Sequence, residues 1–297
     1  MKIRSKVQPG PQWLDIPSPW IDLPGRLRAA CREGEEPSDV RKAVGSGDSG
    51  RPYLIENEAV RQLHFVRSKP HSVMRIADPS ALVMAYTRKM MAFLLFVPRP
   101  SRILLLGLGG GSLAKYCHRH LTGTSLVVVE PDADVVALRE AFSLPPDDER
   151  LHVVGQRWTE FLAKDVRQYD VVLVDDQDAV ELSPPSGAAQ FFRGLARCLL
   201  PHGCLVMHMK GDVERLEAHT ETARSLLDAQ IVPVPLSSSG SLLMYGLRQP
   251  VLQSAPESMD AAARRLQHAL QMDFPDYLYR INENARAENL RADSHKK

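Results

Sequence analysis

The feature that most constrains this chain is an apolar run that leads directly into a glycine-rich loop. Residues 103–106 read Ile-Leu-Leu-Leu, and residues 107–112 read Gly-Leu-Gly-Gly-Gly-Ser before a predicted helix. Glycine permits positive φ angles and lets a ligand approach the backbone closely. The N-terminus of the next helix offers free N–H groups and a partial positive charge, which can hold a carboxylate or phosphate. We therefore expect a ligand-binding loop at the end of a buried strand.

Strands and helices alternate around this loop. Their near-continuous hydrophobicity is typical of strands that are buried on both faces, and helices are predicted from about residues 112 and 133. The pattern predicts an α/β fold with a mostly parallel seven-stranded sheet and helices on both of its faces. The seven predicted strands are residues 102–106, 125–130, 151–154, 170–175, 203–208, 231–234 and 241–247.

The N-terminal part of the chain divides by composition. Residues 1–50 mix Pro, Gly, Ser and charged residues, which predicts a flexible arm. Residues 51–77 contain short alternating apolar and polar runs, which predict a small β module. A helix is then expected from Asp78-Pro79 to Phe96, because an N-cap followed by Pro is a helix start signal.

Residues 78–249 are expected to form one Rossmann-like catalytic domain, and residues 250–297 a C-terminal extension. In that extension a helix is predicted at residues 259–272, followed by a charged and frayed tail.

Composition and net charge restrict the classes of molecule that this protein is expected to bind and its expected cellular location. A formal net charge of +1 gives no basic face of the kind that nucleic acids require, and no run of about eighteen apolar residues occurs. The four cysteines lack the short paired spacing of zinc sites or disulfide frameworks. We expect a cytoplasmic protein that binds neither nucleic acid nor membrane. The His118 and His120 pair would point to different faces of a helix, so no metal site is expected.

Two positions narrow the ligand class. A dinucleotide fingerprint would need Gly or Ala where this chain has Ser112, whereas G-x-G-x-G resembles motif I of the class I methyltransferase fold. Glu130 ends the second strand about twenty residues after the loop, where a carboxylate accepts hydrogen bonds from ribose hydroxyls. Gly107, Gly109, Gly111 and Glu130 are therefore predicted to bind S-adenosylmethionine or a close derivative.

The fourth predicted strand ends in a group of carboxylates that includes Asp175 and Asp178. Open α/β sheets bind ligands at this edge, so these acids could attract a cationic substrate. One of them could also take a proton from an attacking ammonium group. The alternative is an acidic turn that caps the next helix.

Residues 86–247 resemble the spermidine synthase family of aminopropyltransferases, including its bacterial spermidine synthase-like members. The resemblance implies that Asp175 deprotonates the amine, that Asp178 binds the cationic substrate, and that Tyr86 lies near the active site. It also implies a small N-terminal β domain and a possible homodimer. The matching pieces are the helix at residues 86–91, the loop at residues 106–112, Glu130, and the pair Asp175 and Asp178.

Several positions depart from the family's pattern. Gly110 stands where the family usually has an acid, and His71 stands where a glutamine is expected. Gln156 replaces an Asp near the adenine, but its amide still offers a donor and an acceptor, so we assign it to cofactor binding. Ala179 replaces a Pro, and the loop at residues 237–240 is serine-rich instead of bearing a Tyr.

The leading prediction is a spermidine synthase-like enzyme that moves an aminopropyl group from decarboxylated S-adenosylmethionine to an amine or polyamine, without a metal. His208 and Lys210, at the end of the fifth predicted strand, are expected near the substrate, with His208 assigned to substrate binding. A methyltransferase that uses intact S-adenosylmethionine is the first alternative. A non-catalytic binding protein on the same fold is the second.

Overall fold

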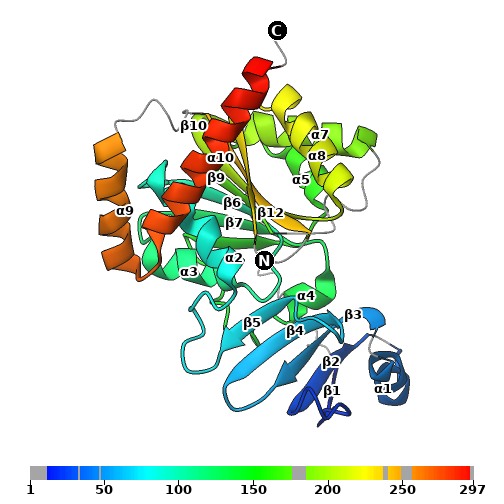
Figure 1. The fold of residues 1–297 in the computed structure, drawn as a ribbon. Coiled ribbons are helices and arrows are strands. Elements are labelled where there is room, and N and C mark those ends of the chain that lie inside the picture. Colours follow the sequence, from blue (N-terminus) through cyan, green and yellow to red (C-terminus); the bar gives the residue numbers. More distant parts are fainter. Residues whose placement is uncertain are drawn as a thin grey trace, which may run out of the picture. The chain divides into compact units, whose positions relative to one another are not determined.

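The computed structural model describes residues 12–32, 34–46, 48–175, 185–236, 240–248 and 256–294. The chain divides into two compact units (Figure 1). The N-terminal unit comprises residues 1–81, 109–112 and 132–145, and the larger unit comprises residues 82–108, 113–131 and 146–297. None of the described helices has the length and apolar character needed to cross a membrane.

The N-terminal unit contains a five-stranded antiparallel sheet in sequential strand order. Three of its strands and its first helix begin before residue 51, so the expectation of a flexible arm over residues 1–50 is wrong for the described residues from Gln12 onward. The elements are β1 (Gln12–Pro17), β2 (Arg26–Cys31), α1 (Pro37–Gly45), β3 (Asp48–Glu56), β4 (Val60–Val66) and β5 (Ser72–Arg75).

Burial of widely spaced apolar residues in one shared core explains why this segment is folded. The apolar residues of the first 50 positions are sparse, but Leu14, Leu27 and Val40 all pack into one core cluster with Tyr53. A composition average cannot detect such spacing. A second cluster in the same unit joins Leu54 of β3 to Phe142, which follows α4 (Ala133–Ala137).

The larger unit contains the seven-stranded sheet (Figure 1). Five strands are parallel and β12 runs antiparallel to both of its neighbours, which confirms the predicted mostly parallel α/β sheet. The strand order is β11 (Gln230–Pro235), β12 (Ser241–Leu247), β10 (Leu199–Lys210), β9 (Tyr169–Val174), β6 (Arg102–Leu106), β7 (Ser125–Val129) and β8 (Leu151–Val154).

Helices cover the sheet, and consecutive strand residues such as Leu104 and Leu105 are both buried, so both faces are covered. The side chains of α5, α7 and α8 share one core cluster with the strands. The helices of this unit are α2 (Ala85–Met90), η1 (Met91–Leu95), α3 (Ser112–His120), α5 (Trp158–Lys164), α7 (Pro185–Cys198), α8 (Val213–Leu226), α9 (Pro256–Leu270) and α10 (Phe274–Ser294).

The helix expected from Asp78-Pro79 begins instead at Ala85, so its predicted start is wrong. Asp78 closes a local turn, because its carboxylate accepts a hydrogen bond from Ser80 and its carbonyl accepts one from the N–H of Ala81. Within the larger unit, Arg88 Nη1 donates to the carbonyls of Leu82 and Val83, both at 2.7 Å. The Arg88 side chain therefore stabilises a non-helical backbone just before Ala85. The Asp78-Pro79 start signal gives no indication of these hydrogen bonds.

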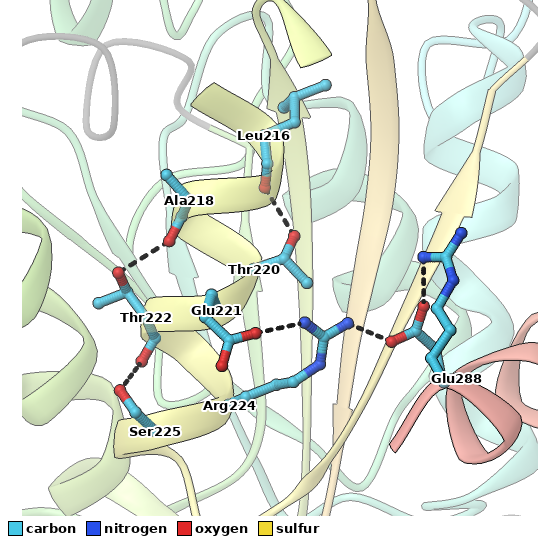
Figure 2. Close-up of polar contacts among 9 residues, drawn as sticks. Leu216, Ala218, Thr220, Glu221, Thr222, Arg224, Ser225 and Glu288 are labelled. Carbon is cyan, nitrogen blue, oxygen red and sulfur yellow. Dashed lines mark hydrogen bonds and ion pairs between the residues drawn. The ribbon is translucent and has the colours of Figure 1, made fainter. Parts of the chain in front are cut away.

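The charged C-terminal tail is also not frayed over its described length, because it forms the long helix α10. Phe274, Leu278, Ile281 and Ala285 recur at helical spacing and are all buried. At the surface, Arg224 of α8 bridges Glu221 on the same helix and Glu288 on α10 (Figure 2). The helix is thus attached by an apolar stripe and by an ion pair.

We expect the apolar stripe to matter more than the ion pair. Ile281 is 1% exposed, so Ile281→Ala should lower the free energy of unfolding by about 2–5 kcal/mol. Arg224→Ala removes a partly exposed pair and should cost roughly 0–1 kcal/mol. Urea titrations of both variants measure the two effects, and an equal loss in the two variants would contradict this ranking.

His64 ends a row of three neighbouring rings in the N-terminal unit and stacks on Tyr53. Tyr53 lies 5.6 Å from Trp20 and 5.5 Å from His64, measured between ring centroids. The buried imidazole donates from Nδ1 to the Val66 carbonyl at 3.2 Å. Burial lowers the pKa of His64 below its ordinary value of 6.5, and the bond to Val66 opposes this only in part. The folded unit therefore favours the neutral ring.

Because the pKa of His64 is lower in the folded state, its neutral form stabilises the unit above pH 6.5, and this contribution is lost as the pH falls. Trp20 becomes the sole tryptophan after Trp13→Phe and Trp158→Phe. Its fluorescence should show a lower urea midpoint at pH 5 than at pH 8. Adding His64→Leu should narrow that difference; an unchanged difference would exclude His64 as its source.

Candidate active site

Backbone hydrogen bonds align the carboxyl ends of the parallel strands of the larger unit. The N–H of Gly107 donates to the carbonyl of Val129, and the N–H of Asp175 donates to that of Leu106, both at 2.9 Å. The N–H of Glu130 donates to the carbonyl of Val154 at 3.0 Å. Gly107, Glu130 and Asp175 therefore lie at one edge of the sheet.

Glu130 is fixed beside the start of the glycine loop. Its Oε2 atom accepts a hydrogen bond from the N–H of Leu108 at 2.8 Å, and the residue is buried. This bond orients a carboxylate that would otherwise be expensive to bury. Gln156 follows the end of β8 at the same edge and is half-buried.

The loop glycines adopt the conformations that their residue type allows. Gly107, Gly109 and Gly111 have φ values of 96°, 50° and 67°. Side chains other than glycine rarely adopt this left-handed region. These three positions therefore use the positive φ angles that glycine permits.

Gly110 lacks a side chain for a different reason, which is packing within the N-terminal unit. A Cβ atom at this position would lie 2.6 Å from Ser72 Oγ and 3.1 Å from a ring carbon of Phe142. Ser72 Oγ is itself 3.4 Å from Ser112 Oγ. The place where the resemblance leads one to expect an acid therefore has no room for one. His71, the other departure in this unit, lies with its ring against Gly109.

Asp175 is held between two ring side chains at the end of β9. Tyr86 Oη donates to Asp175 Oδ2 at 3.1 Å, and His208 Nδ1 lies 3.3 Å from Asp175 Oδ1. The rings of Tyr86 and His208 stack with centroids 4.1 Å apart and an interplanar angle of 23°. The structure therefore brings together three residues that the sequence had assigned separately.

Tyr86 is a neutral hydrogen-bond donor in this group. Burial first, and the negative charge of Asp175 second, raise the pKa of its hydroxyl well above 10.0. Its helix is anchored by Tyr245 of β12, whose hydroxyl donates to the carbonyl of Lys89 at 2.8 Å. This role of Tyr245 could not be predicted from the sequence, because an aromatic residue in an apolar strand carries no local sign of which group its hydroxyl will bond.

Some expected site residues lie outside the described residues: Asp178, Ala179 and residues 237–239 of the serine-rich loop.

His118, one of the two histidines considered as metal ligands, contacts Asp148, with 2.8 Å between Nε2 and Oδ2. Within the described parts of the chain, no group of three or more His, Cys, Asp or Glu side chains is arranged to hold a metal.

Gly110→Ala should destabilise the N-terminal unit by about 1–3 kcal/mol, because the new methyl group overlaps Ser72 and Phe142. Ser72→Gly in the same chain removes the nearest atoms and should restore part of the loss. Gly123→Ala is the matched control, since a Cβ there meets nothing within 4 Å. Thermal unfolding compares the variants, and equal effects at positions 110 and 123 would refute the packing argument.

The chain is similar to known proteins over much of its length. A family model for the spermine/spermidine synthase domain matches residues 83–236. The polyamine aminopropyltransferase of Chromobacterium violaceum is 26% identical over 231 residues, covering 77% of this chain and 88% of that protein.

Two solved structures show the same fold. A spermidine synthase in complex with the transition state analogue AdoDATO superposes with a TM-score of 0.55 at 14% identity, covering 86% of this chain and 87% of that one. Human methyltransferase-like protein 13 superposes with a TM-score of 0.54 at 18% identity, covering 63% of this chain and 93% of that one. The larger unit thus has a methyltransferase-like fold, as predicted.

The curated relatives are named as enzymes, and together with the family match they support aminopropyl transfer as the reaction class of this chain. The matched residues 83–236 make up more than half of the 297 residues. The chain therefore belongs to the spermine/spermidine synthase family.

Proposed function

We propose that this protein transfers the aminopropyl group of decarboxylated S-adenosylmethionine to an amine or polyamine, as a step of polyamine biosynthesis. The observation that carries the proposal is the Asp175 carboxylate held between Tyr86 and His208, at the same sheet edge as Glu130. The family match and the names of the curated relatives support the same chemistry.

The residues of this edge suit an adenosyl group. Glu130 keeps its carboxylate beside the loop through the N–H of Leu108, which suits a group that accepts hydrogen bonds from two ribose hydroxyls. Gln156 offers a donor and an acceptor for an adenine edge. Gly107, Gly109 and Gly111 are proposed to keep the cofactor-binding role assigned from the sequence, because positions without a Cβ atom permit close approach of a ligand to the backbone.

Asp175 has the chemistry of a base for the amine. An ammonium group must lose a proton before its nitrogen can attack, and Asp175 would accept that proton. The nitrogen lone pair then forms a bond to the methylene carbon next to the sulfonium. The carbon–sulfur bond breaks with its electrons passing to sulfur, which releases methylthioadenosine. Tyr86 stays protonated throughout and holds Asp175 Oδ2 as a donor.

The acceptor is proposed to be a cationic amine, because carboxylates at the edge of the sheet attract positive charge. Asp178 is proposed to bind its distal ammonium group. A homodimer stays a prediction of the resemblance, and a cytoplasmic location stays a prediction from the composition of the sequence.

Methyl transfer from intact S-adenosylmethionine is the second candidate, and Gly110 is the observation that favours it. The loop has no acid at this position, and a Cβ there would clash with Ser72 and Phe142. Nothing at position 110 would therefore repel the carboxylate that the intact cofactor carries beside its ammonium group.

The test is amine-dependent release of methylthioadenosine from decarboxylated S-adenosylmethionine, assayed with a panel of diamines. Asp175→Asn should lower kcat by about 10²–10⁴-fold, because the amide cannot take the proton. Binding of methylthioadenosine, measured by calorimetry, should change little. Asp228→Asn, an exposed acid after α8, is the control.

Two results would overturn the proposal. One is an unchanged rate in the Asp175→Asn variant. The other is methyl transfer from the intact cofactor, detected as S-adenosylhomocysteine, without any amine-dependent release of methylthioadenosine.

A further inference from the structure

The orientation of Asp175 is set by more than its backbone. The N–H bond to Leu106 fixes only the main chain. Within the described residues, the side-chain contacts of its carboxylate are the hydroxyl of Tyr86 on Oδ2 and Nδ1 of His208 on Oδ1. Each oxygen therefore has one ring contact.

Strand register places His208 beside Asp175. Strands β9 and β10 are parallel, with Val174 opposite Met207, so the next residues of the two strands are neighbours. On the other side of β10, His208 pairs with Leu243 of β12, which offers no charge or hydrogen-bonding side chain. Among the described residues, the Asp175 carboxylate and the stacked Tyr86 ring contact the His208 ring.

Burial prevents the His208 ring from serving as a flexible surface group. Its side chain is 1% exposed, whereas that of Asp175 is 17% exposed. The carboxylate thus keeps access to a substrate while the imidazole lies behind it. A ring nitrogen that faces a carboxylate is satisfied when it carries the hydrogen and donates it.

We propose that His208 is the positioning residue of this site: its Nδ1–H holds Asp175 Oδ1 so that the carboxylate meets the amine in a single orientation. The kinetic consequence of this role rests on the proposed function, because His208 acts on the reaction through Asp175. It replaces the expectation that His208 binds the substrate directly. Misplacement of a reacting group by about 1 Å can lower the rate by about 10²-fold. Loss of the correct orientation of the Asp175 carboxylate should therefore lower kcat by up to about this factor.

Two substitutions separate the hydrogen bond from the ring stack. His208→Phe keeps an aromatic ring against Tyr86 but removes the donor. His208→Asn removes the ring but places an amide N–H close to the position of Nδ1. We expect His208→Phe to lower kcat by about 10- to 100-fold with little change in KM for the amine. His208→Asn should recover most of that loss. A purely structural role for the ring predicts the reverse order of the two variants.

A second measurement does not depend on turnover. The proton NMR spectrum of the wild-type protein should contain a downfield imidazole N–H signal that is absent from His208→Asn and that shifts or disappears in Asp175→Asn. A signal that is insensitive to Asp175→Asn would overturn the positioning role, and so would wild-type kcat in folded His208→Phe. If no amine releases methylthioadenosine but the N–H signal depends on Asp175, the proposed function fails and the hydrogen bond stands.

Discussion

Parallel strand pairing is the constraint on which the candidate site depends. Residues that are far apart in sequence, such as Glu130 and Asp175, reach one sheet edge because their backbone N–H groups complete the ladders that end β8 and β6. No side chain needs to recruit another over that distance. Strand pairing brings these residues close together, and the side chains of Tyr86 and His208 then orient the Asp175 carboxylate.

The sheet of the larger unit could be predicted from the sequence because the signals that mark its strands are local. A strand buried on both faces is a continuous apolar run, and the glycine loop marks where the first such strand ends. Strands β6, β8 and β12 have the bounds that were expected. Glu130 and Asp175 could be predicted for the same reason, since each follows directly from the end of a strand.

The failures involve information that is not local. The described part of residues 1–50 folds because Leu14, Leu27 and Val40 meet in one core, although apolar residues are sparse in this part of the sequence. The pairing of His208 with Asp175 depends on the register between two strands, and the role of Tyr245 depends on the end of a distant helix. Sequence patterns place such residues on an element but do not name their partners.

The packing around Gly110 also limits how this protein can evolve. Ser72 and Phe142 occupy the volume that a side chain at position 110 would need, and they come from two other segments of the chain. A single codon change that introduced an acid there would first produce a clash. A charged side chain at position 110 therefore requires compensating changes at Ser72 or Phe142, so this loop position is coupled to two distant segments of the chain.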